Sequence, residues 1–126
     1  MVRGSVSANR EALIGVEVLD RDGRPQLREA VLDTGFNGYL SLPSADIRQL
    51  GLLWAGERTF ELANGEPFDF EVYYGWVRWH GRAIRVPILE SEAAPLVGME
   101  LIWGSRVAMD VLAGGAVEIE ELATGG

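Results

Sequence analysis

The sequence predicts a mainly β protein whose strands close into a barrel or a sandwich, with one or two short helices. Runs in which apolar and polar residues alternate, as in strands with one buried face, recur along most of the 126 residues. Short turns rich in Gly, Pro, Asn and Asp separate these runs. Only two short segments have helical character, so about eight to ten short strands must supply most of the core.

Each predicted element is bounded by turn or cap residues. In chain order we expect strands at 11–19, 27–32 and 39–42, a helix at 43–50, strands at 59–63, 67–79 and 82–89, a helical turn at 99–103, and strands at 107–111 and 116–122. The helix follows from Pro43 at its start, Ile47 and Leu50 on its inner side, and Gly51 at its end.

The Asn64-Gly65 pair predicts a β-hairpin. It stands between two strand-like runs, and both residues of a type I′ turn must take positive φ, which Asn and Gly do most easily. The strand that returns from Pro67 is long, and a second turn is expected at His80-Gly81. Alternation sorts the long strand into two faces, one with Phe68, Phe70, Val72, Tyr74 and Trp76, the other with Asp69, Glu71 and Tyr73.

The composition excludes several classes of function. The chain has no cysteine, which removes disulfides, thiol catalysis and thiolate metal sites and fits a reducing cytoplasm. Its one histidine, His80, excludes metal sites with several histidine ligands. A net charge of −8 without a basic stripe argues against a nucleic acid partner. No segment approaches the ~20 apolar residues of a membrane span, and the start lacks the apolar core of a signal peptide, so we expect a cytoplasmic protein without a membrane partner.

The stretch with the clearest chemical content is Asp33-Thr34-Gly35. Three apolar residues, 30–32, have the character of a buried strand, and Gly35 ends that strand with a turn. Asp33 therefore lies at the mouth of a strand, where a carboxylate is costly to desolvate unless it is hydrogen-bonded or used in chemistry. Gly35 lets a ligand or another chain come close to the backbone.

Three further motifs follow this tripeptide in a fixed order. The ordered set is Asp33-Thr34-Gly35-Phe36-Asn37-Gly38-Tyr39-Leu40-Ser41-Leu42-Pro43, Leu50-Gly51-Leu52, Leu96-Val97-Gly98-Met99-Glu100-Leu101-Ile102 and Gly114-Gly115-Ala116-Val117-Glu118-Ile119. It resembles the retropepsin-like aspartic proteases, and more closely the small single-domain bacterial and archaeal enzymes of clan AA. The resemblance implies one domain over residues 1–126, a closed antiparallel barrel with one or two short helices, acting as a homodimer.

The resemblance also implies an aspartic endopeptidase, which hydrolyses peptide bonds through a water held between two carboxylates. Carboxylates this close share one proton; the ionised one takes a proton from the water, and the protonated one stabilises the developing oxyanion. The chain has a single Asp-Thr-Gly, and its other aspartates lack that context. The second carboxylate would be Asp33 of an identical subunit across a twofold axis, so homodimerisation is a requirement of this function.

The remaining roles follow from the same resemblance. Beside the catalytic Asp33, Thr34 would hydrogen-bond across the dimer axis and Gly35 would let substrate pass close. The N- and C-terminal strands would interlock between subunits. The substrate would be an extended peptide or protein segment with apolar side chains in pockets, bound without cofactor or metal. Its binding residues would be Phe36, Asn37, Asn64 and Gly65 (the tip of a flap), and Leu96 and Val97 (the wall of the groove).

Phe36 motivates an alternative function. Viral and pepsin-like relatives usually carry Ser or Ala after the tripeptide, and a serine there can bond the outer carboxylate oxygen, which Phe cannot. The alternative is a peptide-binding or dimerisation module on the same fold, without turnover. A third possibility, a metal site formed by Asp33 and another acid, has no Asp-x-Asp-x-Asp loop to support it.

Overall fold

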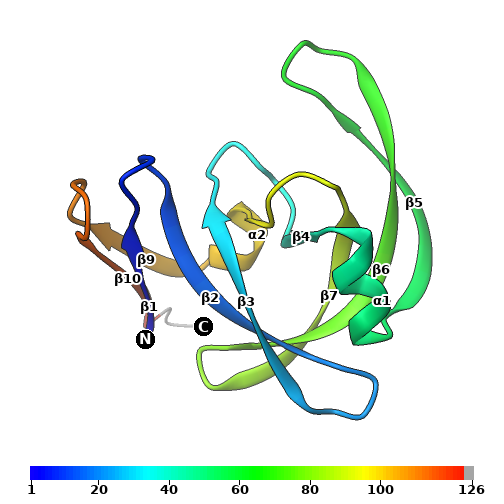
Figure 1. Cartoon of the computed structure of the whole chain (residues 1–126), viewed down its shortest axis with the longest axis horizontal. Helices are drawn as coiled ribbons and strands as arrows, with labels where there is room; N and C mark the ends of the chain where they lie inside the picture. The colour runs from blue at the N-terminus through cyan, green and yellow to red at the C-terminus, as the bar shows by residue number, and fades with distance from the viewer. Residues whose placement is uncertain (124–126) are drawn as a thin grey trace.

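A computed structural model describes residues 1–123, and its strands form one continuous sheet (Figure 1). The strands are β1 (Val2–Val6), β2 (Ala12–Leu19), β3 (Pro25–Leu32), β4 (Leu40–Leu42), β5 (Leu53–Glu61), β6 (Pro67–Trp79), β7 (Arg82–Glu90), β8 (Leu96–Val97), β9 (Ser105–Met109) and β10 (Ala116–Glu121), and the helices are α1 (Ser44–Leu50) and α2 (Met99–Ile102). Their order in the sheet is β5-β6-β7-β4-β8-β3-β2-β1-β10-β9. The predicted mainly β fold with two short helices is confirmed. No helix in this part of the chain is long and apolar enough to cross a membrane.

A second pairing of β6 closes the sheet into a barrel. β6 pairs with β5 and β7, and its last residues also pair with β2, where Val18 lies opposite Val77. Both valines are completely buried, and burial of a side chain of this size contributes ~1.5–3 kcal/mol. The core therefore lies inside the barrel, and the loop that carries Asp33, between β3 and β4, lies at one end of it (Figure 1).

Helix α1 forms where the sequence predicts it. Pro43 precedes its first turn, and Ile47 and Leu50 are buried. Gly51 ends it in the left-handed conformation, with a φ of 68°, and donates its N–H to the carbonyl oxygens of Ile47 and Arg48. The glycine thereby satisfies carbonyl groups that the last turn of the helix leaves unpaired.

One strand is longer than the sequence indicates, and one strand is additional. β5 begins at Leu53 rather than near residue 59, because it pairs with β6 along its length although most of its side chains face solvent. A bulge between Trp54 and Gly56 bends it. β1 is an additional strand, paired with both β2 and β10, and Gly4 allows this close approach, since a Cβ there would lie 1.9 Å from the carbonyl oxygen of Leu13.

Of the two turns that flank β6, the first differs from the geometry that the sequence predicts. Gly65 has a φ of 85° but Asn64 does not take a positive φ, so the predicted type I′ turn is wrong. Gly65 N–H donates to the Leu62 carbonyl at 2.9 Å, which gives a three-residue loop closed by a type I turn and a left-handed glycine. The type I′ geometry occurs at His80-Gly81 instead, where φ is 51° and 77°.

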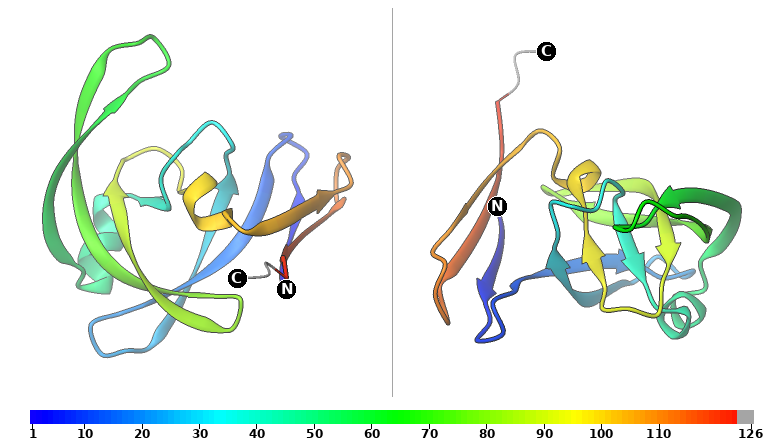
Figure 2. Two further views of the ribbon diagram at one scale, coloured as in Figure 1. Left: turned by 180° about the vertical axis from the view of Figure 1, so that it is seen from behind. Right: turned by 90° about the horizontal axis from the view of Figure 1, so that it is seen from above.

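β1, β10 and β9 form an arm beside the barrel (Figure 2). β1 pairs with β2 on one edge and with β10 on the other, and β10 pairs with β9. Val117 and Ile119 of β10 are completely buried. Both terminal strands thus hydrogen-bond along both edges within one chain, which differs from the expected interlocking between subunits. The arm ends in β9, which pairs on one edge only among the described residues.

His80 connects the β6–β7 turn to this arm. Its Nε2 lies 2.8 Å from Ser105 Oγ, at the start of β9, and its ring lies against the Trp79 ring. Partial burial lowers the pKa of His80 below its usual 6.5; Arg82 acts in the same direction and Glu121 in the opposite one.

Acidification is expected to destabilise the original protein more than its His80→Gln variant. A histidine whose pKa is lowered by folding binds its proton more readily in the unfolded chain, so the stabilisation is complete above about pH 6.5 and is lost as the pH falls through the folded-state pKa. Urea unfolding at about pH 8 and about pH 5 measures the effect. Equal losses in the two proteins would contradict it.

Candidate active site

Asp33 stands directly after β3, a strand in the middle of the sheet. β3 lies between β2 and β8, and β8 runs parallel to β3 and antiparallel to β4. The N–H of Asp33 donates to the carbonyl oxygen of Val97 at 2.9 Å, and the N–H of Val31 donates to that of Pro95 at 2.8 Å. Backbone pairing with β8 therefore fixes the place from which the Asp33 side chain projects.

The carboxylate of Asp33 is partly engaged by its own turn. Oδ1 accepts a hydrogen bond from the N–H of Gly35 at 2.8 Å, and a Cβ at Gly35 would lie 3.2 Å from the same oxygen. Within residues 1–123 no hydrogen-bond donor reaches Oδ2. Thr34 and Asn37 are exposed on either side of this turn. One oxygen thus orients the side chain and the other remains open to a water or a second acid.

Phe36 and two glycines fasten the loop to the segment that follows β8. The Phe36 ring lies against both glycines, since an added Cβ would come within 2.5 Å of the ring at Gly38 and 2.6 Å at Gly98. The carbonyl oxygen of Phe36 accepts the N–H of Met99 at 2.8 Å, and the N–H of Gly98 donates to the carbonyl oxygen of Tyr39 at 3.1 Å. The ring therefore has a structural contact, and its place beside a substrate stays a prediction.

Phe36→Ala is expected to lower the free energy of unfolding by about 2–3 kcal/mol, because a packed but partly exposed ring is removed from Gly38 and Gly98. Phe68→Ala, which removes the same ring from an exposed position, is the control and should cost less than about 1 kcal/mol. Urea unfolding of both variants checks the prediction. A loss of equal size in the control would contradict it.

The predicted site residues fall into two groups in space. Leu96 and Val97 pair with the end of β3 and so lie directly beside the Asp33 loop; the Val97 side chain is completely buried and the Leu96 N–H donates to Ser41 Oγ at 3.1 Å. Residues 33–38 and 96–97 therefore form one unit. Asn64 and Gly65 lie apart from it, at the tip of the β5–β6 hairpin, which rises from the barrel on the side of the Asp33 loop (Figure 1).

The β5–β6 hairpin, which we call the flap, has two faces of different chemistry. Side chains alternate along paired strands, so residues opposite one another share a face. On one face the Phe60 and Phe70 ring centroids are 5.9 Å apart and those of Phe68 and Phe70 are 4.8 Å apart, with Arg58 opposite Phe70. The other face carries the acids Glu57, Glu61, Asp69 and Glu71.

The acidic face of the flap continues the interior face of the barrel. Asp69 and Glu71 alternate in phase with Gly75 and Val77, which are buried in the core. The aromatic face is continuous instead with Leu96, because Val72 lies opposite Leu89, Leu89 opposite Ser41, and Ser41 opposite Leu96. On this face Val72 is buried, whereas Phe68, Tyr74 and Trp76 are exposed. The rings of the flap were therefore missed as site candidates, since only the pairing of four strands connects them to Leu96.

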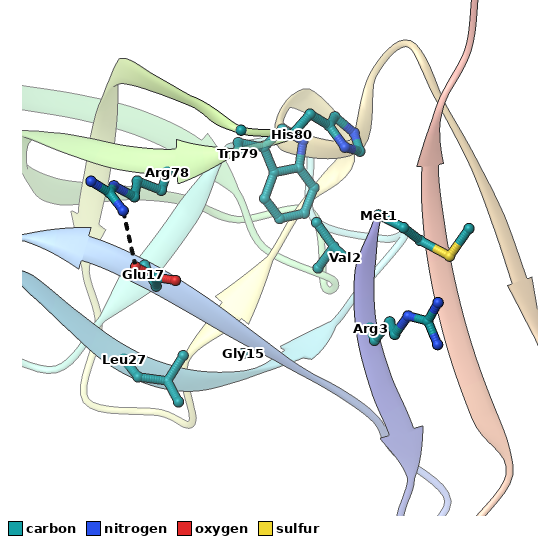
Figure 3. A pocket seen from close by; sticks show the side chains of 10 residues that line it. Met1, Val2, Arg3, Gly15, Glu17, Leu27, Arg78, Trp79 and His80 are labelled. Atoms are coloured by element: carbon teal, nitrogen blue, oxygen red, sulfur yellow. Dashed lines mark ion pairs between the residues drawn. The ribbon is translucent and has the colours of Figure 1, made fainter.

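Asp33 is half-buried at one end of the barrel. It lines none of five cavities of about 320–440 Å³ in the described part of the chain. Figure 3 shows one of them, about 360 Å³, between β1 and the end of β6, where the Trp79 side chain points toward Val2 and Arg78 lies 4.0 Å from Glu17. Residues 1–123 hold no group of three acids or histidines placed to bind a metal ion.

Comparison with known proteins identifies the fold. Protein-family models and curated proteins give no match to the sequence. The structure is similar to EIAV protease complexed with the inhibitor HBY-793, with a TM-score of 0.55 and 15% identity over 75% of this chain and 88% of that one. It is also similar to the solution structure of simian foamy virus (mac) protease, with a TM-score of 0.50 and 16% identity over 71% and 90%. The chain has a retropepsin-like fold. In this retropepsin-like barrel the Asp33 loop and β8 lie beside one another, and the flap stands over the same end.

Proposed function

We propose that the chain is a homodimeric aspartic endopeptidase whose catalytic groups are the Asp33 carboxylates of two copies. The observation that carries the proposal is the geometry of Asp33: Gly35 N–H holds Oδ1 at 2.8 Å, Oδ2 has no donor within the described residues, and β8 anchors the backbone. General acid–base chemistry needs a positioned carboxylate with one oxygen free. The likeness of the fold to two proteases supports the same reaction class.

The second carboxylate would come from a second copy of the chain. Three of the five other aspartates are engaged elsewhere: Asp20 accepts hydrogen bonds in the β2–β3 turn, Asp46 pairs with Arg28 at 2.7 Å, and Asp69 accepts the Thr59 hydroxyl on the flap. A twofold axis beside Asp33 would bring the same loop of both copies together.

The outer edge of β9 supports pairing with a second copy of the chain. It is the end of the sheet, and its five residues present backbone groups that a further strand can pair with. Antiparallel pairing of two copies centred on Val107 would set Arg106 opposite Ala108, so no like charges would face each other. This is edge-to-edge docking of complete arms, in place of interlocked termini.

The chemistry would proceed by proton exchange within the pair. Two carboxylates at one water share a single proton and titrate as a unit, because both cannot stay ionised so close together. The ionised Asp33 accepts a proton from the water, and the water oxygen attacks the peptide carbonyl carbon. The protonated Asp33 donates its proton to the carbonyl oxygen. The resulting diol collapses: the C–N bond breaks, the amine leaves with a proton from one carboxyl, and the diol returns a proton to the other.

The substrate would be an extended peptide held between the Asp33 loops and the flaps. Thr34 and Gly35 flank the catalytic group in this proposal, and the groove is bordered by the residues that the sequence predicts: Phe36, Asn37, Asn64, Gly65, Leu96 and the backbone of Val97. Closure of the flap would exclude water from the reaction. The rings on the flap face that continues to Leu96 favour a substrate with apolar side chains beside the scissile bond.

Peptides with Phe or Leu beside the cleaved bond are therefore expected to be cut about tenfold faster than matched peptides with Glu. Phe70→Ser should narrow this ratio to about twofold, since it removes a ring from the flap face that continues to Leu96. Leu27→Ser, which removes an exposed apolar side chain from β3, is the control. A preference that survives Phe70→Ser would contradict this role of the flap.

Incubation of the full chain with a library of unstructured peptides tests the proposed function. Mass spectrometry should detect internal cleavage between about pH 4 and about pH 7 that pepstatin inhibits. Sedimentation should show a dimer, and on dilution the rate should fall with the square of the protein concentration. A strictly monomeric protein, or intact peptides over the whole pH range, would refute the proposal.

A peptide-binding or dimerisation module without turnover is the second candidate. The observation that favours it is Phe36, which supplies no hydroxyl to the Asp33 carboxylate where a serine would. It predicts a dimer that binds library peptides and leaves them intact. The same two measurements therefore separate it from the endopeptidase.

A further inference from the structure

The outward face of β6 carries aromatic side chains beside a cavity that the proposed active site does not use. Tyr74 and Trp76 are 37% and 49% exposed on this face, and Leu53 of β5, opposite Tyr74, is 75% exposed. They border a cavity of about 440 Å³, which we call the outer cavity. Large apolar and aromatic side chains gathered at a hollow are typical of binding surfaces.

Two arginines have defined positions at the outer cavity. The guanidinium of Arg85 lies over the Tyr74 ring, 4.0 Å from its centroid. The Arg21 side chain lies against Gly51 at the end of α1, where an added Cβ would meet its Nε at 2.6 Å. Neither arginine takes part in an ion pair within residues 1–123. Their donors therefore remain available to an anionic ligand.

The acid at the outer cavity forms no ion pair with these arginines, because both of its oxygens are engaged in its own turn. Asp20 Oδ1 accepts the N–H groups of Asp22 at 2.9 Å and Arg24 at 3.0 Å, and Oδ2 accepts Gln26 Nε2 at 3.2 Å. In a protein with a net charge of −8, the outer cavity is thus a place where two cations stand next to aromatic surface.

The outer cavity is remote from Asp33. Arg21 precedes β3 and Asp33 follows it, so the eight residues of that strand separate them. Eight extended residues span about 26 Å. Figure 1 shows the β2–β3 turn and the start of β5 at the end of the barrel opposite the Asp33 loop. A ligand here would leave the groove at Asp33 open.

We propose that the outer cavity binds a peptide segment in which a carboxylate stands next to an aromatic side chain. The carboxylate accepts hydrogen bonds from Arg85 and Arg21, whose planar forks suit its two oxygens. The aromatic ring lies on Trp76 and Leu53 and buries surface that is otherwise exposed. The outer cavity thereby serves as a docking site for acidic, aromatic segments of a partner protein, apart from any cleavage.

The test uses three capped peptides and the ¹⁵N-labelled Asp33→Asn protein, so that cleavage does not interfere. Acetyl-Glu-Glu-Phe-Glu-Glu-amide should shift the backbone amide signals of residues 19–21, 51–53 and 74–76 and the Trp76 indole signal. The peptide with Gln for every Glu tests the charge, and the peptide with Ser for Phe tests the ring. Both should bind about tenfold more weakly.

Arg85→Gln and Trp76→Ser should each weaken binding of the first peptide about tenfold. Both positions are exposed enough for the variants to fold. Arg78→Gln, an exposed arginine on the same face of β6 that does not border the outer cavity, should stay within about twofold of the parent protein. Signal shifts confined to residues 33–38 would overturn the proposal. Equal binding of the Gln or Ser peptide, or no effect of Arg85→Gln and Trp76→Ser, would overturn it as well.

Discussion

Asp33→Asn is expected to reduce peptide cleavage by at least about 10³-fold and to change the free energy of unfolding by less than about 0.5 kcal/mol. The amide oxygen of Asn can still accept the N–H of Gly35, so the turn keeps its hydrogen bond. The amide cannot take a proton from water, which removes the acid–base step. Cleavage of one peptide selected from the library and urea unfolding measure the two quantities. Asp22→Asn, the same chemical change at an exposed turn position, is the control.

Mixing the two proteins tests whether each site needs two copies of Asp33. If subunits pair at random, an equal amount of Asp33→Asn protein should cut the activity per original subunit to about one half, and a threefold excess to about one quarter. The Asp22→Asn protein should leave it unchanged. Undiminished activity in the first mixture would mean that one chain forms a complete site, which would contradict the shared dyad.

Gly98→Ala is expected to lower the free energy of unfolding by at least about 3 kcal/mol and to abolish cleavage. A Cβ at this position would lie 2.3 Å from the carbonyl oxygen of Gly38 and 2.6 Å from that of Phe36. Both atoms are backbone, so they cannot move aside without displacing the loop that holds Asp33. Thermal unfolding and peptide cleavage are the measurements.

Gly15→Ala is the matched control for this change. A Cβ at Gly15 would meet the Leu27 side chain at 3.1 Å, and that side chain is mostly exposed and can rotate away. This control should lower the free energy of unfolding by less than about 1 kcal/mol. If the two variants unfold at the same denaturant concentration, close backbone contact at Gly98 is not what holds the Asp33 loop.

Local chemistry made the centre of the fold predictable. The apolar run before Asp33 gives β3, and Pro43 and Gly51 mark the two ends of α1 without reference to any distant residue. The same holds for β10, where Val117 and Ile119 alternate with acids and are buried. The residues that begin and end these elements are local in the sequence, so a sequence pattern identifies them.

Long-range packing decided the features that the sequence did not reveal. The inward side of β6 uses Gly75, where a Cβ would meet the Ile88 side chain at 2.6 Å, together with Val77 and Trp79, while on the apolar side Val72 is buried and Trp76 is exposed. No property of the strand alone tells which face is covered. The first half of β5 is likewise a strand only because β6 pairs with it.

The candidate site was partly predictable for the same reason. Residues 33–38 and 96–97 belong to contiguous motifs, and the structure places them side by side. The rings of the flap, such as that of Phe70, are connected to the Leu96 face only through the pairing of β6, β7, β4 and β8. The outer cavity combines Arg21, Leu53 and Arg85 from three separate segments, which no short motif contains.

The arm of β1, β10 and β9 has a consequence for when the protein acts. Because its strands are completed within one polypeptide, folding does not have to wait for an encounter with another copy. In the proposed dimer, assembly along β9 is then a separate equilibrium that depends on abundance. Dilute protein would consist of intact but silent subunits, each with half of a site. Accumulation in one place would switch hydrolysis on, so local concentration would itself regulate the enzyme.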